Sequence, residues 1–111
     1  MKITDRGTYT ILADDRGSYA EFLPFLEQQM RTHFYEQNVV VDLLKYTHIS
    51  LDELLDILVL SNTHRSSGKS FIIVNDSINP DDVPDELIVV PTLQEAADVV
   101  EMEEIERDLG F

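Results

Sequence analysis

The chain has 111 residues, which is the length of one ordinary domain. Twenty-two acidic residues oppose eight Lys and Arg, so the formal net charge is -14, and hydrophobic residues make up 43% of the chain. This composition supports a hydrophobic core. It argues against nucleic acid or an anionic membrane surface as the main ligand, because both favour Lys and Arg. With no cysteine, disulfides, Cys-ligated zinc and a thiol nucleophile are excluded.

The acidic residues are concentrated near the C-terminal end. Residues 76–111 contain 12 of the acids and a single base, Arg107. This skew favours a partner protein with a basic surface. The first residues contain no apolar signal-peptide core, and every apolar run is far shorter than the roughly 20 residues of a membrane-spanning helix. We therefore expect a cytoplasmic protein.

The first third of the chain predicts a hairpin followed by a helix. Residues 1–4 and 8–13 are expected to pair through a turn at residues 5–7, and Ser18 with Glu21 has capping-box spacing. Apolar residues then recur every four positions: Phe22, Leu26, Met30 and Phe34. A proline inside a helix costs roughly 3 kcal/mol, so the helix is expected to begin near Pro24.

The rest of the chain alternates strands and helices. Residues 38–44, 70–75 and 87–90 are apolar runs of strand length, and residues 76–85 form a loop or one short helical turn. Capping boxes start two more helices, at Ser50 with Glu53 and at Thr92 with Glu95. In the second helix Leu51, Leu54, Leu55 and Leu58 recur at helical spacing, and the last helix is expected to bury Leu93, Ala96, Ala97 and Val100.

This order predicts an α/β fold: a small, mixed, mostly parallel sheet with an N-terminal hairpin and three to four helices. Residues 1–101 form the single domain. Residues 102–111 are expected to be an acidic tail that frays after about Val100, because Glu101, Glu103, Glu104, Glu106 and Asp108 repel one another at a helix C-terminus.

Most catalytic motifs are missing or incomplete. Gly68-Lys69-Ser70 resembles the end of a phosphate-binding loop, but Thr63 occupies the position of the first glycine and a strand follows. It is interpreted as a turn that ends a helix. The three histidines (His33, His48 and His64) lack metal-ligand spacing. We therefore predict no catalytic residue, no metal ligand and no cofactor.

Carboxylates near strand ends suggest one alternative. Asp14, Asp15 and Asp76 follow predicted strands and Asp42 ends one, at the edge where ligands of α/β sheets gather. Asp14, Asp15 and Asp42 resemble the metal-binding acids of a phosphorelay receiver, which would make the chain a Mg²⁺-dependent aspartyl phosphoacceptor. However, the intervening strand and the lysine expected after residues 87–90 are both missing, and turn formation also explains Asp14 and Asp15.

Residues 39–100 resemble the STAS domain of bacterial anti-sigma factor antagonists. The match is an apolar strand ending in Asp42-Leu43, then a loop, then a helix that opens at residues 50–54. Residues 71–75, followed by 88–90 and the helix start Thr92-Leu93-Gln94-Glu95-Ala96, resemble the family's later elements. The resemblance implies a STAS-like fold and a regulatory module that binds an anti-sigma factor or a kinase-like regulator.

The chain departs from the family at the phosphorylation site. The family's Asp-Ser-Ser-Gly aligns with Ser50-Leu51-Asp52-Glu53, so Leu51 stands where the phosphoacceptor serine would be. The usual serine switch is therefore not expected. Ser50 is either a helix cap or an unusual phosphoacceptor. Asp52 and Glu53 would supply fixed negative charge at the helix N-terminus.

By resemblance, the partner-binding residues are Ser50, Leu51, Asp52 and Glu53, with Asp14 and Asp15 alongside. Leu51 is either an exposed apolar anchor or, being in phase with Leu54, Leu55 and Leu58, part of the core. A further interpretation is a structural homodimer formed through a sheet edge or the last helix.

Overall fold

The computed structural model describes residues 1–15 and 17–110, which form a five-stranded sheet with the order β1-β2-β3-β4-β5. The first pair of strands is antiparallel and the other three pairs are parallel. The prediction of a mixed, mostly parallel sheet with an N-terminal hairpin is confirmed. The strands are β1 (Lys2–Asp5), β2 (Thr10–Ala13), β3 (Val39–Asp42), β4 (Phe71–Val74) and β5 (Ile88–Val90).

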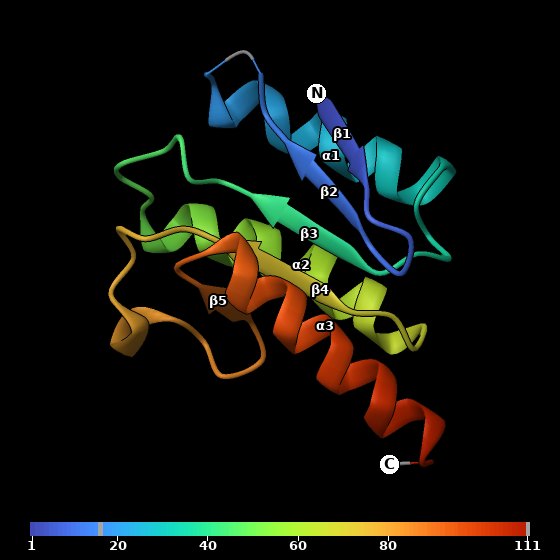
Figure 1. Ribbon diagram of the computed structural model, residues 1–111. Coiled ribbons are helices and arrows are strands. Elements are labelled where there is room, and N and C mark those ends of the chain that lie inside the picture. Colours follow the sequence, from blue (N-terminus) through green and yellow to red (C-terminus); the bar gives the residue numbers. More distant parts are fainter. Residues whose placement is uncertain (16, 111) are drawn as a thin grey trace.

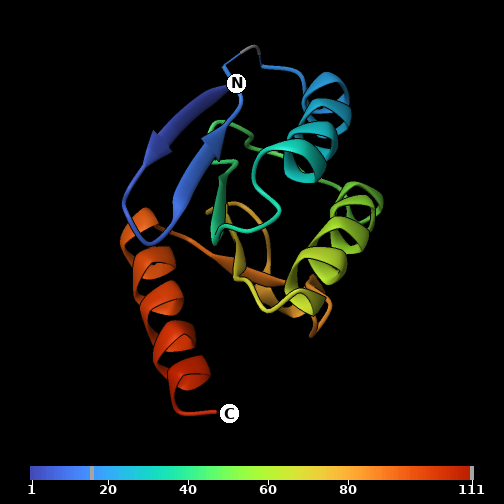
Figure 2. The same cartoon turned by 90° about the vertical axis from the view of Figure 1, so that its right-hand side faces the viewer.

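The helices lie on both faces of this sheet. Figure 2 shows α1 (Tyr19–Thr32) and α2 (Leu51–Ser66) on one side and α3 (Leu93–Asp108) on the other. Between β4 and β5 the chain makes only a short 3₁₀ turn, η1 (Pro80–Asp82), as the sequence predicts. Consecutive parallel strands are therefore joined by α1 and α2 on one face, while only loop and η1 join the last two (Figure 1).

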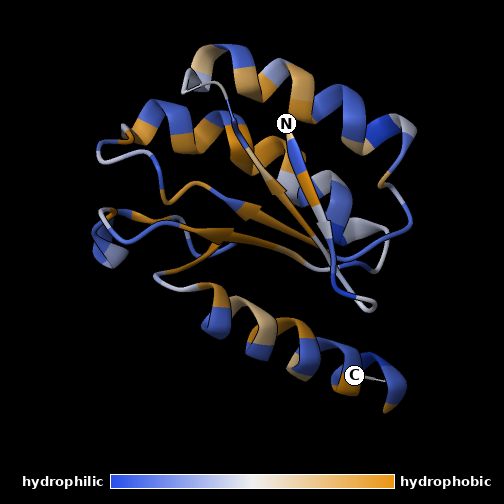
Figure 3. Cartoon of the chain, turned by 45° about the horizontal axis from the view of Figure 1, so that its top comes forward, coloured by the Kyte–Doolittle hydropathy of each residue, from blue (hydrophilic) through white to orange (hydrophobic). Residues whose placement is uncertain are grey.

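Alternate residues of each strand enter two separate cores, because side chains point to opposite faces along a strand. The larger core joins β2, β3 and β4 to α1 and α2 through residues such as Leu12, Val41 and Ile73. The smaller core joins the same strands to α3, and includes Val40 and Val100. Central strands buried on both faces explain the continuous apolar runs seen in the sequence (Figure 3).

The boundary of α1 differs from the prediction. The helix begins at Tyr19, with Ser18 as its N-cap, and Pro24 lies inside it instead of near its start. Pro24 lacks the N–H that would bond the carbonyl of Ala20. The burial of Phe22, Leu23, Leu26 and Met30 in the larger core compensates for the lost hydrogen bond.

The C-terminal segment also differs from the prediction. Residues 102–108 continue α3 as regular helix, so they are not a separate tail. Polar side chains hold this half of the helix against the domain. Arg65 of α2 pairs with Glu103 at 2.6 Å. Glu104 and Arg107 pair with each other within α3, and both form hydrogen bonds with Asn38.

Within the described ranges, none of the helices combines the length and apolar character that a membrane crossing would require.

Candidate functional site

The carboxyl ends of β2, β3 and β4 meet at one edge of the sheet, and the loops that follow them gather there (Figure 1). Asn75, which follows β4 and is only 3% exposed, holds two of these loops together. Its Nδ2 donates to the carbonyls of Leu43 (2.8 Å) and Tyr46 (2.9 Å), while its Oδ1 accepts from the backbone N–H of Ile78 (3.1 Å). These hydrogen bonds from Asn75 hold the backbone of the loop before α2 in place. Sequence reasoning missed Asn75, although an Asn just after a strand is a common turn former.

The start of α2 is fixed by the capping box that the sequence predicts. The backbone N–H of Glu53 donates to Ser50 Oγ at 3.2 Å, and the backbone N–H of Ser50 donates to Glu53 Oε1 at 3.0 Å. Asp52 lies in the same first turn and is exposed. The two carboxylates face the partial positive charge of the helix N-terminus, which stabilises them. The structure therefore places Ser50 as a helix cap, one of the two roles considered for it.

Leu51 is exposed, which decides between its two predicted environments. Its side chain is 53% accessible, whereas Leu54, three residues later, is 2% accessible. Leu55 is also exposed, at 42%. Of the two environments considered for Leu51, the structure therefore shows the exposed one, and Leu55 shares it although both are in phase with Leu54. The buried stripe of α2 instead consists of Leu54, Ile57, Ser61 and His64.

The exposed Leu51 lies beside the connection between β4 and β5, in which the described residues form only the short turn η1. A hollow of about 460 Å³ remains between the start of α2 and the η1 loop. Its lining residues come from the loop before α2, its first turn and the η1 loop: His48, Ile49, Leu51, Leu54, Ser77, Ile78, Asn79 and Asp82.

Asp14 is connected to the start of α2 through two tyrosines. Tyr46 donates its hydroxyl to Asp14 Oδ2, and its ring packs edge-on against Tyr19 with centroids 5.8 Å apart. Tyr19 in turn donates to the backbone carbonyl of Glu53 at 2.7 Å. Burial raises the pKa of Tyr46, and the hydrogen bond to Asp14 and the charge of Asp14 raise it further. Burial, and then the charge of Glu53, raise the pKa of Tyr19. Both hydroxyls therefore remain protonated donors at neutral pH.

Asp14 and Asp15 take separate positions. Gly17 donates its N–H to Asp14 Oδ2 at 2.6 Å, as expected of a turn-forming aspartate. Asp15 is half-exposed and accepts a hydrogen bond from the amino group of Met1 at 3.0 Å. Asp14 is linked to the start of α2 through Tyr46 and Tyr19.

Asp14 and Asp42 lie on opposite faces of the sheet. Leu12 of β2 pairs in register with Val41 of β3, and both enter the core beneath α1 and α2. Asp14 is two residues beyond Leu12 and shares that face, whereas Asp42 follows Val41 and points to the α3 face. Asp42 accepts a hydrogen bond from the N–H of Leu44 at 3.0 Å. Across residues 1–15 and 17–110, the structure places no group of three or more His, Cys, Asp or Glu that could hold a metal ion.

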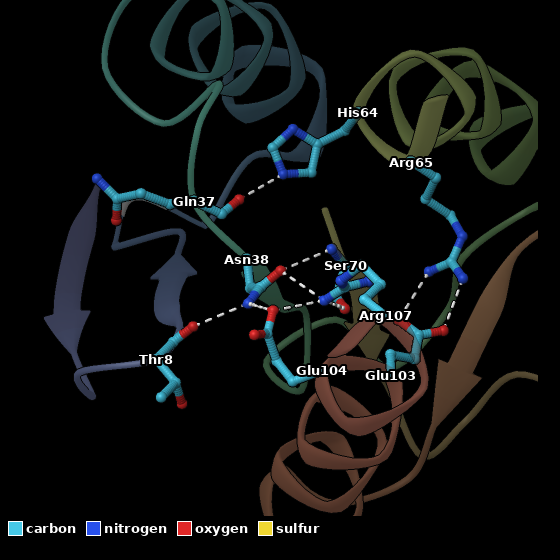
Figure 4. Close-up of polar contacts among 9 residues, drawn as sticks. All are labelled: Thr8, Gln37, Asn38, His64, Arg65, Ser70, Glu103, Glu104 and Arg107. Carbon is cyan, nitrogen blue, oxygen red and sulfur yellow. Dashed lines mark hydrogen bonds and ion pairs between the residues drawn. The ribbon is translucent and has the colours of Figure 1, made fainter. Parts of the chain in front are cut away.

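A second polar cluster lies at the opposite end of the strands, where β3 and β4 begin (Figure 4). It was not predicted from the sequence. Asn38, which is 5% exposed, contacts four other residues. It donates to the Thr8 carbonyl (3.0 Å) and Glu104 Oε1 (2.7 Å), and its Oδ1 accepts from the Ser70 N–H (2.8 Å) and Arg107 (3.1 Å). The cluster joins the β1–β2 turn, the starts of β3 and β4, and the end of α3. The only signal in the sequence was Arg107 as the single base in an acidic segment.

His64 lies beside this cluster and is 5% exposed, so it is a core residue. Its Nε2 is 2.6 Å from the carbonyl oxygen of Gln37, and its ring packs edge-on against Phe71. Burial lowers the pKa of His64, the hydrogen bond to Gln37 opposes this effect, and the charges of Lys69 and Arg65 add to the lowering. The neutral imidazole, donating to Gln37, is therefore the stable form in the fold.

Neither a protein-family model nor a curated protein sequence matches the chain.

Proposed function

We propose that this chain is a STAS-like regulatory domain that binds another protein and catalyses no reaction, with its contact surface at the start of α2. The surface consists of Leu51 and Leu55 as apolar anchors, with Ser50, Asp52 and Glu53 around them. We call it the α2 surface. Asp14 borders it through the Tyr46–Tyr19 pair, and Asp15 lies further along the same loop.

The exposure of Leu51 carries the proposal. A leucine that is 53% accessible in the first turn of a capped helix, at the rim of a hollow of about 460 Å³, is a poor choice for stability alone. Apolar anchors beside a concave surface and bordered by charge are typical of protein interfaces. Because the capping box and Asn75 fix the surrounding backbone, little ordering entropy would be lost when a partner binds.

The same geometry supports a module that is not switched by the usual serine phosphorylation. By the resemblance to STAS domains, Leu51 aligns with the phosphoacceptor serine, and it has no hydroxyl. Ser50 Oγ is engaged as the helix cap, and the Glu53 carboxylate lies 3.0 Å from the Ser50 backbone nitrogen. A phosphate on Ser50 would be close to that carboxylate and would be repelled by it. The fixed charges of Asp52 and Glu53 are constant features of this surface.

Affinity capture from the native cell tests the proposal. The wild-type chain and Leu51→Arg are compared, with Ile3→Arg as the matched control, because Ile3 is 51% exposed on the distant edge strand β1. We expect wild type and Ile3→Arg to retain the same specific protein and Leu51→Arg to lose it, with all three giving the same circular dichroism spectrum. Equal capture by all three would show that the α2 surface is not the contact site.

A further inference from the structure

The polarity of α3 reverses along its length. In its first half, Ala96 and Val100 face the sheet and are 0% and 1% exposed. In its second half, the residues in the same phase are Glu103, Glu104 and Arg107, and they bind the domain by polar contacts (Figure 4). The domain-facing side of this half is therefore charged. This pattern is the opposite of that expected for a helix packed on a core.

Apolar residues occupy the outward side of the same half. Met102, Ile105 and Leu109 are 53%, 53% and 66% exposed. Their spacing of i, i+3 and i+7 aligns them in one stripe, about 180° around the helix from Val100 and Arg107. The Arg65–Glu103 ion pair fixes the rotation of the helix, together with the hydrogen bonds of Glu104 and Arg107 to Asn38, so the stripe is held away from the domain.

Acidic side chains surround the stripe. Glu101 and Asp108 lie along one side of it, Glu106 along the other and Asp98 one turn before it, and all four are exposed. The one base of α3, Arg107, points the other way and pairs with Glu104 at 2.6 Å. Glu106 lines a hollow with Arg65, Lys69 and Arg107, so bases of this domain lie near it. Among residues 1–15 and 17–110, the structure gives no ion pair to Glu101 or Asp108. The negative charge on that side of the stripe is available to a basic partner.

We propose that the outward face of α3 docks a basic amphipathic helix of a partner protein. Apolar residues at i, i+3 or i+4, and i+7 of that helix would pack on Met102, Ile105 and Leu109. Its flanking Lys and Arg would pair with the acidic borders. This is a different surface from the α2 surface, on the other side of the sheet (Figure 2), and neither proposal depends on the other.

The charges favour this occupant over two others. A second copy that paired α3 with α3 would place acidic borders against acidic borders, which costs affinity. An anionic membrane would repel the same acidic residues. A basic helix relieves the repulsion among the α3 carboxylates and covers the apolar stripe at the same time.

A peptide titration on the full chain tests the proposal. The probe is a fluorescent amphipathic peptide of about 18 residues (five helical turns) with Leu at the i, i+3, i+7 positions and Lys beside them. The control probe has Glu in place of each Lys. Binding is followed by fluorescence anisotropy, and its position is mapped by NMR chemical shifts of the protein. The variants are Ile105→Gln and, as matched control, Val59→Gln, since Val59 is 69% exposed on α2.

We expect the basic peptide to bind wild type and Val59→Gln equally, with shifts confined to residues 98–109, and the acidic peptide not to bind. Ile105→Gln should weaken binding at least tenfold. No binding, shifts centred on another surface, or equal binding by Ile105→Gln would overturn the proposal. Light scattering provides the remaining outcome: a wild-type dimer that Ile105→Gln converts to monomer would assign the stripe to a second copy and would also overturn it.

Discussion

Tyr46 donates its hydroxyl to Asp14, and this hydrogen bond joins the loop after β2 to the loop that leads into α2. The two residues are 32 positions apart in the sequence. The pair lies on the face of the sheet beneath α1 and α2, where Tyr19 packs against Tyr46 and bonds the backbone of Glu53. The shape of the proposed α2 surface therefore depends on contacts from the loop after β2, the loop before α2 and the start of α1.

Replacing Tyr46 by Phe should weaken this junction. Tyr46→Phe leaves the Asp14 carboxylate without its phenolic donor, and a hydrogen bond to a charged group contributes about 1.5–3 kcal/mol. We expect the free energy of unfolding, measured by urea denaturation, to fall by about that amount. Tyr35→Phe is the control, because Tyr35 is 54% exposed. A loss no greater than that of Tyr35→Phe would show that the Tyr46–Asp14 contact adds no stability.

The cap of α2 can be tested by two substitutions of one residue. Ser50→Ala removes the oxygen that accepts the Glu53 N–H, and loss of a helix cap costs roughly 1 kcal/mol. Ser50→Asp restores an acceptor at the cap and should keep most of the stability. Thermal unfolding of both variants measures this. If Ser50→Ala were as stable as Ser50→Asp, the capping role assigned to Ser50 would be incorrect.

The buried His64 should make stability fall with mild acid. Its pKa in the fold is lowered, chiefly by burial, so the unfolded chain binds the proton more readily than the folded chain. Stability from this source is present above the unfolded pKa of about 6.5 and is lost as the pH falls below it. We expect the free energy of unfolding to decrease between about pH 7 and pH 5.5.

Substitution of His64 isolates its contribution. His64→Gln should reduce the slope of unfolding free energy against pH in this window, although its absolute stability will be lower. His33→Gln, at an exposed histidine, controls for the substitution itself. A slope for His64→Gln as steep as that of wild type would mean that another group causes the pH dependence.

Arg107 should anchor the last two turns of α3. Its guanidinium contacts Asn38, Ser70 and Glu104 at 3.1, 3.1 and 2.6 Å. All three contacts are made by one nitrogen, Nη2, so Arg107→Ala removes them together. We expect Arg107→Ala to accelerate amide hydrogen exchange in residues 101–108, while exposed Arg31→Ala leaves it unchanged. Unchanged exchange in Arg107→Ala would show that the helix end is held by other contacts.

The sequence predicted the features that depend on local patterns. The order of strands and helices, the N-terminal hairpin and the Ser50–Glu53 capping box all follow from residues close together in the chain, and the structure confirms them. Hydrogen bonds between residues close in the chain, such as those of Ser50 and Glu53, depend on a fixed sequence spacing, so the sequence alone predicts them.

Features that depend on distant contacts could not be predicted in this way. Leu51 and Leu55 have the same helical spacing as the buried Leu54, and their exposure depends on how α2 packs in the folded chain. Pro24 is tolerated inside α1 because tertiary burial outweighs local propensity. Arg107 stabilises a helix end that local repulsion alone would fray, through residues as far away as Asn38.

Photo-cross-linking in the native cell tests the central proposal most directly. A photoreactive benzophenone amino acid is placed at position 51, and separately at the control position 3, and the products are identified after irradiation. If the α2 surface binds a protein, position 51 should give a discrete cross-linked product that position 3 does not, and Leu55→Arg should abolish it. If position 51 gives no product, or only the products seen from position 3, then the proposed contact surface is contradicted.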